Sequence, residues 1–448
     1  MMDSGRKTGS LSIGLLFLLL PSLAMASEGS TQVDFPLWSG AFFIGLLLCI
    51  AIIPLINGDW WGKYFGFVSI GLAIPAAFIV CFTDWTLLLH VLQEYISFII
   101  LLGSLFIIAG GIVIRVGAQG TPMLNTVFLL IGSIFASLIG TTGASMVLLR
   151  PLIRSNKWRK HVVHIYIFFI FMVSNIGGLL TPLGDPPLFL GFLKGVPFFW
   201  TLRLLPIWAF AIGILLILFF AFDSFLAKKE DPQSARNAAE KLPEKKLEIK
   251  GKINFIFLLI VIASFFLPAI PWLRELVMIA AAVLSVFLTN KSLREENAFT
   301  YHPIKEVAIL FAGIFVTMVP VLTMLQVHGS QLGVVQPWQF FWASGSLSSF
   351  LDNAPTYLVF MSTAQSVAHA QGILSGLVVG VPETLLKAIS AGSVCMGANS
   401  YIGNGPNFMV KAICEENNVR MPSFFGYMAW SIGILIPIFI FITYIFFK

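Results

Sequence analysis

Charged residues are scarce in this sequence. Asp, Glu, Lys and Arg make up 11% of the 448 residues, less than half of the ~25% typical of soluble domains. Hydrophobic residues make up 58%, and no polar stretch is long enough to fold as a separate domain. The composition excludes a soluble globular protein and predicts an all-α polytopic membrane protein whose chemistry takes place inside the bilayer.

Cysteine is also scarce, and the four present form no CxxC pair. All of them lie in or beside apolar runs, so neither a disulfide framework nor a transition-metal site is indicated, and we expect no cofactor. The formal net charge of +6 could suggest a nucleic-acid partner. The basic residues, however, gather in loops between apolar runs, as the positive-inside rule requires. We therefore expect lipid around the chain and no nucleic-acid partner.

Histidine is sparse, with six residues scattered along the chain. His161 and His164 stand three positions apart at the start of one apolar run. Two imidazoles without a third ligand are more typical of a helix end at the membrane interface than of a metal site.

The first 26 residues have the parts of a secretory signal peptide. Arg6 and Lys7 precede a short apolar run, which ends in an A-x-A site at Ala24 and Ala26. The alternative is an uncleaved first helix, but the run contains Pro21 and is short for a ~30 Å hydrocarbon core. Cleavage would leave the new N-terminus outside the cytoplasm and would place the protein in a bacterial inner membrane.

Ten apolar runs beyond the signal peptide are predicted to cross the membrane. They cover residues 37–57, 63–83, 97–116, 162–180, 198–222, 253–270, 276–288, 307–325, 384–402 and 423–447. Two further apolar stretches, 125–152 and 340–367, are interrupted by small and polar residues. We expect these two to enter and leave on the same side, because the basic loops then stay inside, with Lys194 and Arg274 as minor exceptions.

The chain divides into two similar halves, a repeat at 37–222 and a repeat at 253–448, joined by a basic cytoplasmic linker at 223–252. At a shift of 219 residues (404 − 185) several polar, Gly and Pro positions coincide. The pairs are Gly178 with Gly397, Thr181 with Ser400, Gly184 with Gly403 and Pro187 with Pro406. Chance is the alternative, since Gly and Pro are common in membrane helices.

Each half is predicted to have five transmembrane helices, one of them discontinuous, and a re-entrant hairpin. Because five crossings are an odd number, the second half runs upside down relative to the first. Two inverted-topology repeats with paired interrupted segments are typical of secondary transporters that bind substrate near the bilayer midplane.

The interrupted segments are the candidate site, because a broken helix leaves backbone groups that only a cavity, water or an ion can satisfy. Asp185 stands at the first break and Asp352 at the second hairpin tip. A carboxylate at the bilayer centre costs on the order of 3 kcal/mol, which makes both functional candidates. The alternatives are a helix N-cap for Asp185, weighed equally, and a surface turn for Asp352.

The interrupted segments resemble a known group of proteins. The residues SNIGGLLTPLGDPPLFLGF pair with GANSYIGNGPNFMVKAI, and GTTGAS pairs with LDNAPT. In these motifs the sequence resembles the ion transporter (ArsB/NhaD) superfamily, and in particular the NhaD-type sodium/proton antiporters and the related CitMHS-like citrate transporters. The resemblance implies a homodimer and sodium bound between hairpin tip and helix break. It implies a first ion site near Thr141, Thr142, Ser145, Asn175 and Asp185, and a second near Asp352, Asn353, Thr356, Asn399 and Asn404.

The leading hypothesis is exchange of Na+ or Li+ for H+ by alternating access. Asp352 would be the principal carboxylate that holds either ion, and Asp185 the second. Neutral oxygen ligands would come from Asn353, Asn404, Thr142 and Thr356. The alternative is Na+-coupled transport of citrate or another small anion. It is disfavoured because the tips lack the paired Ser-Asn-Thr of the dicarboxylate branch and no intramembrane Arg offsets the two acids.

An integral-membrane enzyme and a passive channel are rivals from other classes. No loop pairs a nucleophile with a base, and no HExxH, GxSxG or P-loop motif occurs. Paired discontinuous helices suit occlusion of a substrate better than continuous flow. We therefore expect a transporter that is not an enzyme.

Overall fold

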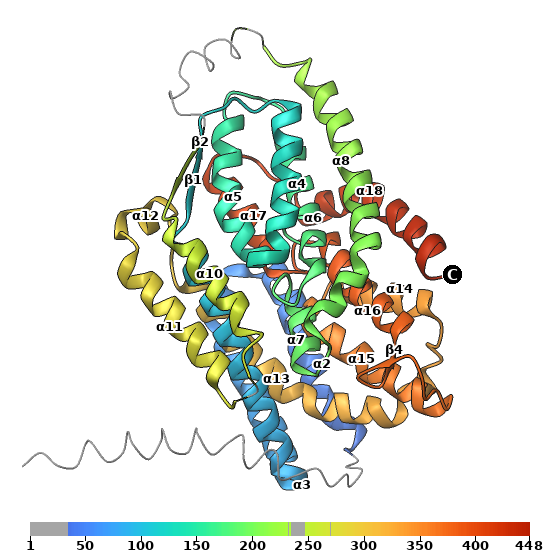
Figure 1. Ribbon diagram of the computed structural model, residues 1–448. Helices are drawn as coiled ribbons and strands as arrows, with labels where there is room; N and C mark the ends of the chain where they lie inside the picture. The colour runs from blue at the N-terminus through green and yellow to red at the C-terminus, as the bar shows by residue number, and fades with distance from the viewer. Residues whose placement is uncertain (1–34, 232, 234–246, 269) are drawn as a thin grey trace, which may run out of the picture. The chain divides into compact units, whose positions relative to one another are not determined.

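The computed structural model describes residues 35–231, 233, 247–268 and 270–448, and the described chain is mostly helical (Figure 1). The predicted signal peptide at 1–26 lies outside the described residues. Seven described helices are long and apolar enough to cross a membrane. Together with the composition, they define a polytopic membrane protein.

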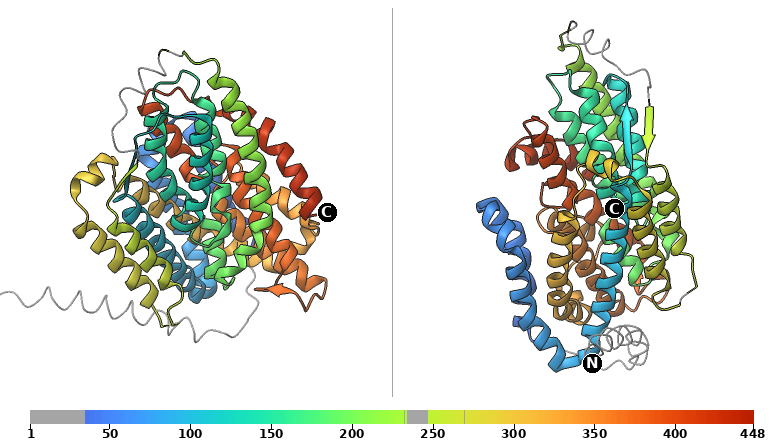
Figure 2. Two further views of the ribbon diagram at one scale, coloured as in Figure 1. Left: turned by 45° about the horizontal axis from the view of Figure 1, so that its top comes forward. Right: turned by 90° about the vertical axis from the view of Figure 1, so that its left-hand side faces the viewer.

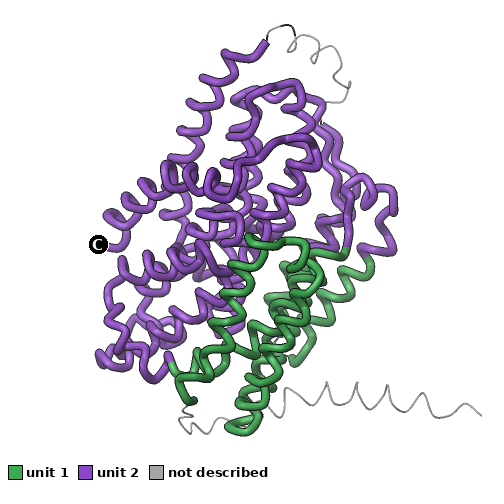
Figure 3. The backbone as a smooth tube through the Cα atoms, turned by 180° about the vertical axis from the view of Figure 1, so that it is seen from behind, with its two compact units in different colours: residues 1–104, 259–284, 301–324 green, residues 105–258, 285–300, 325–448 purple. Residues whose placement is uncertain are grey.

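The chain forms two compact units, which are coloured separately in Figure 3. Unit 1 consists of residues 1–104, 259–284 and 301–324, and unit 2 of residues 105–258, 285–300 and 325–448. Each unit therefore draws on both halves of the sequence, and the unit boundaries do not follow the predicted repeats at 37–222 and 253–448.

Unit 1 is built from apolar helices, and some of these helices extend across the unit boundary into unit 2. They are α2 (Ala41–Ile56) after the 3-10 turn η1 (Leu37–Gly40), α3 (Gly58–Ala109), α10 (Ile253–Ser264), α11 (Leu273–Leu288) and α13 (His302–His328). The sequence predicts two spans where the structure has the single helix α3. Its backbone leaves helical geometry at Asp84, whose Oδ1 accepts bonds from the Thr86 N–H (2.9 Å) and Oγ1 (2.6 Å). The polar gap between the two predicted spans is thus a kink within α3, and the side chain of Asp84 caps the helical segment that follows it.

The third predicted span, 97–116, ends too late. Helix α3 stops at Ala109, and β1 (Val113–Val116) pairs antiparallel with β2 (Leu247–Lys250) from the linker. The two strands lie side by side as arrows in Figure 2. β-branched residues in β1 favour an extended strand over a helix end.

Unit 2 holds the interrupted segments of both halves. From the first half come α4 (Pro122–Ile139), α5 (Thr141–Asn156), α6 (Val163–Met172), η2 (Ile176–Leu180), α7 (Pro186–Leu193), η3 (Phe198–Leu204) and α8 (Leu205–Ala227). From the second half come α12 (Lys291–Glu296), η4 (Gly329–Leu332), α14 (Pro337–Ser348), α15 (Asn353–Ala370), β3 (Leu377–Val378), β4 (Val381–Pro382), α16 (Glu383–Met396), η5 (Gly397–Asn399), α17 (Gly405–Glu416) and α18 (Phe424–Phe446).

The two hairpins turn inside apolar sequence, as predicted. The first turns at Gly140, whose φ of 82° lies in the region that favours glycine, and α5 begins at the next residue. The second turns over residues 349–352, between α14 and α15. Both hairpins therefore place the start of a helix at the tip, where the Thr141 N–H donates to the Gly184 carbonyl at 2.8 Å and the Ala354 N–H to Asp352 Oδ1 at 3.0 Å.

The two helix breaks have the same local structure. In each, a helix passes through a short 3-10 turn, extends and restarts at a proline-containing first turn. Asp185 (φ −147°, ψ 145°) and Asn404 (φ −154°, ψ 140°) are the extended residues directly before the restart. Proline cannot donate to the preceding turn and favours an extended residue before it, which explains the break at Pro186.

Candidate functional site

Asp185 is the centre of a buried polar network in unit 2. It is 2% exposed and accepts hydrogen bonds from three neutral side chains. Thr141 Oγ1 lies 2.9 Å and Asn404 Nδ2 3.0 Å from Oδ1, and Asn353 Nδ2 lies 2.5 Å from Oδ2. The network thus joins the first hairpin, the first break, the second hairpin and the second break.

The broken helix turns the Asp185 carboxylate into this network. Asp185 occupies the N-cap position of α7, but its side chain makes no capping bond to that helix. Its backbone carbonyl instead accepts from the Leu188 N–H at 3.1 Å. The residue therefore has the position of a cap, while its carboxylate remains available to the site.

Asp352 has the opposite arrangement. It is half-buried, and its Oδ1 accepts the Ala354 N–H at 3.0 Å as the N-cap of α15. Thr356 Oγ1 donates to the Asp352 backbone carbonyl at 3.0 Å. Capping holds Asp352 at the helix end, so its neighbour Asn353 is the residue that reaches Asp185.

Asparagine amides extend the network on the side of the second break. Asn404 Nδ2 also lies 3.2 Å from the Ser174 carbonyl and 3.3 Å from Asn175 Oδ1. Asn175 Nδ2 donates to Asn407 Oδ1 at 2.7 Å, and Asn407 Nδ2 donates to two carbonyls of the second break. These bonds fix the amide orientations, because each amide nitrogen must face an acceptor.

Three of the predicted residues lie at the margin of the network. Ser145 Oγ is 2.9 Å from Ser174 Oγ, and Asn399 Nδ2 donates to Ser349 Oγ at 2.9 Å. Thr142 is half-buried and makes no side-chain hydrogen bond within the described part of the chain. The predicted site set therefore contains both direct partners of Asp185 and residues that do not touch it.

Sequence reasoning leaves Ser174 and Ser349 without a role, and it predicts Asn407 as a side-chain amide of the second break but not as a residue of either ion site. Asn407 stands in the second break three residues after Asn404, and Ser174 directly precedes Asn175. A signal for both was available, since each is a polar residue in an otherwise apolar segment. Ser349 has a weaker signal, because it lies in a run of serines.

Two buried side-chain amide oxygens have no hydrogen-bond partner among the described residues: Asn353 Oδ1 and Asn399 Oδ1. Nor does a Lys, Arg or His side chain within the described ranges pair with Asp185. A buried carboxylate, an unsatisfied amide oxygen and a threonine hydroxyl form an oxygen-rich donor set, which suits a hard monovalent or divalent cation.

A multi-pass helical protein with paired broken helices around a buried polar centre belongs to the class of membrane transporters. Residues 32–447 match the model of the CitMHS_2 family, described as "Putative citrate transport", and the chain belongs to that family within the ion transporter superfamily. No curated protein matches the chain. Membership indicates a secondary transporter and favours transport over catalysis.

Proposed function

We propose that the protein exchanges Na+ or Li+ for H+ by alternating access, with Asp185 as the carboxylate that holds either ion. The observation that carries the proposal is the set of partners around this carboxylate. Thr141, Asn353 and Asn404 are all neutral, and the unsatisfied Asn353 Oδ1 lies on the same amide that contacts it. Among these four residues Asp185 thus supplies the only negative charge, and its three partners are neutral.

Electrostatics makes the two ions alternatives at such a carboxylate. A lone negative charge buried in a low dielectric is expensive, so it is neutralised by a proton or by a bound cation. A protonated carboxyl has lost most of its attraction for Na+, and bound Na+ disfavours the proton. Competition for one group couples the two fluxes without any further contact.

The two similar breaks support alternating access. Thr181 and Ser400 are related by the 219-residue shift, and each donates from its hydroxyl to a carbonyl of the nearby hairpin, that of Ser137 or Ser349. With Asp185 and Asn404 also equivalent in backbone conformation, we propose that the halves are inverted-topology repeats. On this proposal the membrane is the bacterial inner membrane, where ion gradients drive such exchange.

Reconstituted vesicles test the proposal. The purified protein is placed in proteoliposomes with an acidic interior reported by a pH-quenched dye, and Na+, Li+ or K+ is added outside. Wild type is expected to dissipate the pH gradient with Na+ and Li+, and Asp185→Asn to lose the response. Asp59→Asn, at an exposed carboxylate in the first turn of α3, is the matched control. A folded Asp185→Asn protein with full exchange would refute the role of Asp185.

Na+-coupled uptake of citrate is the second candidate, and the family description favours it. In this case Asp185 would hold a coupling cation, and the positive charge of that cation would offset part of the negative charge of citrate. Labelled citrate is therefore supplied to the same vesicles with an inward Na+ gradient. Na+-dependent accumulation of citrate above its equilibrium level would support citrate uptake. Na+-driven proton movement in the absence of citrate would support Na+/H+ exchange.

A further inference from the structure

The two helix breaks of unit 2 carry different side chains at equivalent positions. Asp185 and Asn404 are both extended, and each stands directly before the start of a helix. Each backbone carbonyl accepts an N–H three residues on, that of Leu188 at 3.1 Å or that of Asn407 at 3.0 Å. Neither side chain caps its helix. Because the backbone makes the same demands at both positions, the difference between Asp and Asn is one of charge.

Asn404 faces hydrogen-bond acceptors. Its Nδ2 lies 3.0 Å from Asp185 Oδ1, 3.2 Å from the Ser174 carbonyl and 3.3 Å from Asn175 Oδ1. An ionised carboxylate only accepts hydrogen bonds, so an aspartate here would place a further acceptor beside that of Asp185. Two carboxylates in one buried site do not both stay ionised unless a proton or a cation lies with them. The amide at position 404 therefore spares the site a second negative charge.

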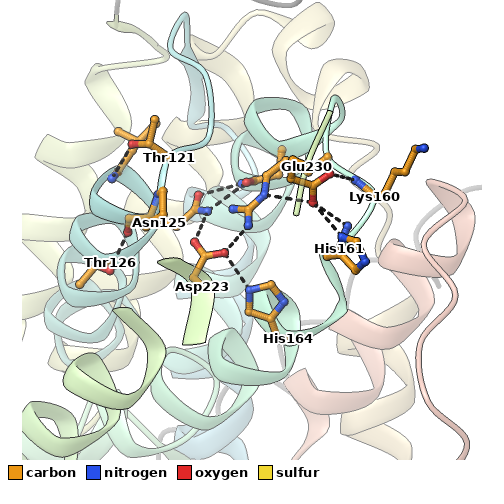
Figure 4. Close-up of polar contacts among 12 residues, drawn as sticks. Thr121, Asn125, Thr126, Lys160, His161, His164, Asp223 and Glu230 are labelled. Carbon is orange, nitrogen blue, oxygen red and sulfur yellow. Dashed lines mark hydrogen bonds and ion pairs between the residues drawn. The ribbon is translucent and has the colours of Figure 1, made fainter. Parts of the chain in front are cut away.

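Asp185 differs from another buried carboxylate of unit 2 in its partners. Asp223 on α8 accepts from Arg159 Nη2 at 2.5 Å, and Asn125 and His164 also contact it (Figure 4). Asp223 thus has a guanidinium as a permanent counter-charge. The side chains that donate to Asp185 within the described chain are all neutral. Since uncompensated buried charge is costly, the counter-charge of Asp185 is left to the transported ion.

The positive side chains on the four segments that meet at Asp185 stand well beyond the contact. On each segment the first Lys, Arg or His follows the contacting residue by at least seven positions (411 − 404), about 10 Å along a helix. These residues are Arg150 on α5, Lys194 after α7, His369 on α15 and Lys411 on α17.

Two other ionisable side chains, Asp352 and Cys395, interact electrostatically with Asp185. Neither brings a positive charge. Asp352 Oδ1 accepts the Ala354 N–H at 3.0 Å as a helix cap, and the thiol of Cys395 is fully buried. A group that keeps the same charge throughout the transport cycle cancels from the charge moved per cycle. The number of charges exchanged is therefore set by Asp185 and by whatever stands at position 404.

We propose that the exchange is one-for-one and electroneutral, and that Asn404 is the specificity residue that makes it so. Asp185 carries one Na+ in one direction and one H+ in the other, and no net charge crosses the membrane. One negative charge also suits a monovalent cation better than a divalent one, because ligand charge tunes cation affinity. The inference rests on the proposed function, since it gives the stoichiometry and ion class of the same site.

The null point of exchange measures the stoichiometry of the wild type. Proteoliposomes with a fixed Na+ gradient are given a series of pH gradients, and K+ with valinomycin sets the membrane potential. Net proton movement is expected to stop where the proton ratio equals the Na+ ratio, at every potential. A null point that moves with the potential would overturn one-for-one exchange, whether or not any variant folds.

Asn404→Asp adds a second carboxylate and is expected to change both properties. Two protons should then exchange for one Na+, so that the null point moves with the potential, and Ca2+ should also drive proton movement. Asn353→Asp adds the same charge beside the other Asp185 oxygen and is the second variant if the first does not fold. A folded Asn404→Asp protein that keeps one-for-one exchange and ignores Ca2+ would overturn the role of Asn404.

Asn290→Asp is the matched control. Asn290 is the exposed N-cap of α12 and lies outside the network, and Asp is as good an N-cap as Asn. The variant makes the same amide-to-acid change and is expected to keep the null point and ion preference of the wild type. A potential-dependent null point in Asn290→Asp as well would show that added charge anywhere has the same effect, and would overturn the role of Asn404.

Thermal unfolding provides a readout that does not depend on transport. Ca2+ is expected to raise the unfolding temperature of Asn404→Asp by several degrees and to leave wild type and Asn290→Asp unchanged. Equal Ca2+ shifts in all three proteins, or none in Asn404→Asp, would show that Asn404 does not set the charge of the site. Absence of Na+-driven proton movement in wild type, with a Ca2+ shift confined to Asn404→Asp, would refute the proposed exchange and leave the role of Asn404 standing.

Discussion

Asn353 Nδ2 lies 2.5 Å from Asp185 Oδ2, although the two residues are 168 positions apart in the chain. The bond joins the second hairpin tip to the first helix break. Resemblance assigns these residues to two separate ion sites, whereas the structure links both sets through one carboxylate. The hydrogen-bonded network around Asp185 therefore takes side chains from both halves of the sequence.

Asp352 is expected to contribute to helix stability more than to ion exchange. Its Oδ1 caps α15 through the Ala354 N–H, and Asn is as good an N-cap as Asp. Asp352→Asn should therefore keep most of the Na+-driven proton movement, and Asp352→Ala should lose ~1 kcal/mol of unfolding free energy. Transport assays and thermal unfolding of both variants check this. Loss of exchange in a folded Asp352→Asn protein would return the principal role to Asp352.

Sequence patterns locate the helix breaks and the hairpin turns because the causes of both are local. Proline removes a backbone donor and glycine permits close approach, so the breaks at Asp185 and Asn404 are visible in the sequence. The N-cap position of Asp185 follows in the same way from the two prolines after it. The hairpin turn at Gly140 likewise follows from small residues within an apolar run.

What the sequence does not reveal depends on contacts between distant segments. Nothing in the sequence near Asp352 indicates that its side chain accepts a hydrogen bond from the Ala354 N–H. Nor does it indicate that the Asn353 side chain donates to Asp185. The residues of β1 extend because β2, more than 130 positions later, offers a partner strand. The sequence ranks Asp352 over Asp185 because a helix N-cap is an equal alternative for Asp185, whereas the surface-turn alternative for Asp352 is weakened by its apolar neighbours. It does not show which carboxylate caps its own helix, which in the structure is Asp352.

The close backbone approach at the first break should not tolerate a methyl group. A Cβ on Gly184 would lie 2.1 Å from the Gly178 carbonyl oxygen, which is backbone and cannot move aside. Gly184→Ala is expected to cost about 1–3 kcal/mol of unfolding free energy and to impair transport. Gly405→Ala is the control, because a Cβ there meets nothing within 4 Å. Thermal unfolding of both variants measures the difference, and equal stability would show that the break relaxes freely.

The ion pair between Arg115 and Glu296 should stabilise the protein only where Glu296 is ionised. Arg115 Nε and Nη2 lie 2.7 and 2.8 Å from the two carboxylate oxygens, and this hydrogen bonding lowers the pKa of Glu296 below its ordinary value. A depressed folded pKa means that the contribution is complete above the unfolded value of ~4.3 and is lost as pH falls through the folded value.

Glu296→Gln is therefore expected to destabilise by ~1 kcal/mol or less at pH 7, with the difference shrinking as pH falls below ~4. Salt at ~1 M should shrink it too, because the Arg115 side chain is 45% exposed. Unfolding temperatures at two pH values and two salt concentrations test this. The neighbouring exposed carboxylate gives the control Glu295→Gln, which should show no such trend. A Glu296→Gln effect that persists at low pH would mean that packing, not charge, is lost.

The adjacent residues Thr141 and Thr142 offer the sharpest test of the site geometry. Thr141 is buried and its Oγ1 donates to Asp185 Oδ1 at 2.9 Å, whereas Thr142 is half-buried without a side-chain hydrogen bond in the described chain. Valine replaces a hydroxyl by a methyl group at nearly constant volume. Thr141→Val removes a donor from a buried carboxylate, a loss on the order of 1–3 kcal/mol, and should weaken Na+ binding and shift the pH dependence of exchange. Thr142→Val should leave Na+ binding and the pH dependence of exchange near wild type, although resemblance makes Thr142 an ion ligand.

The apparent KM for Na+ at two pH values distinguishes the two variants. A larger effect at Thr142 would mean that the transported ion binds on the opposite face of the hairpin tip from Asp185.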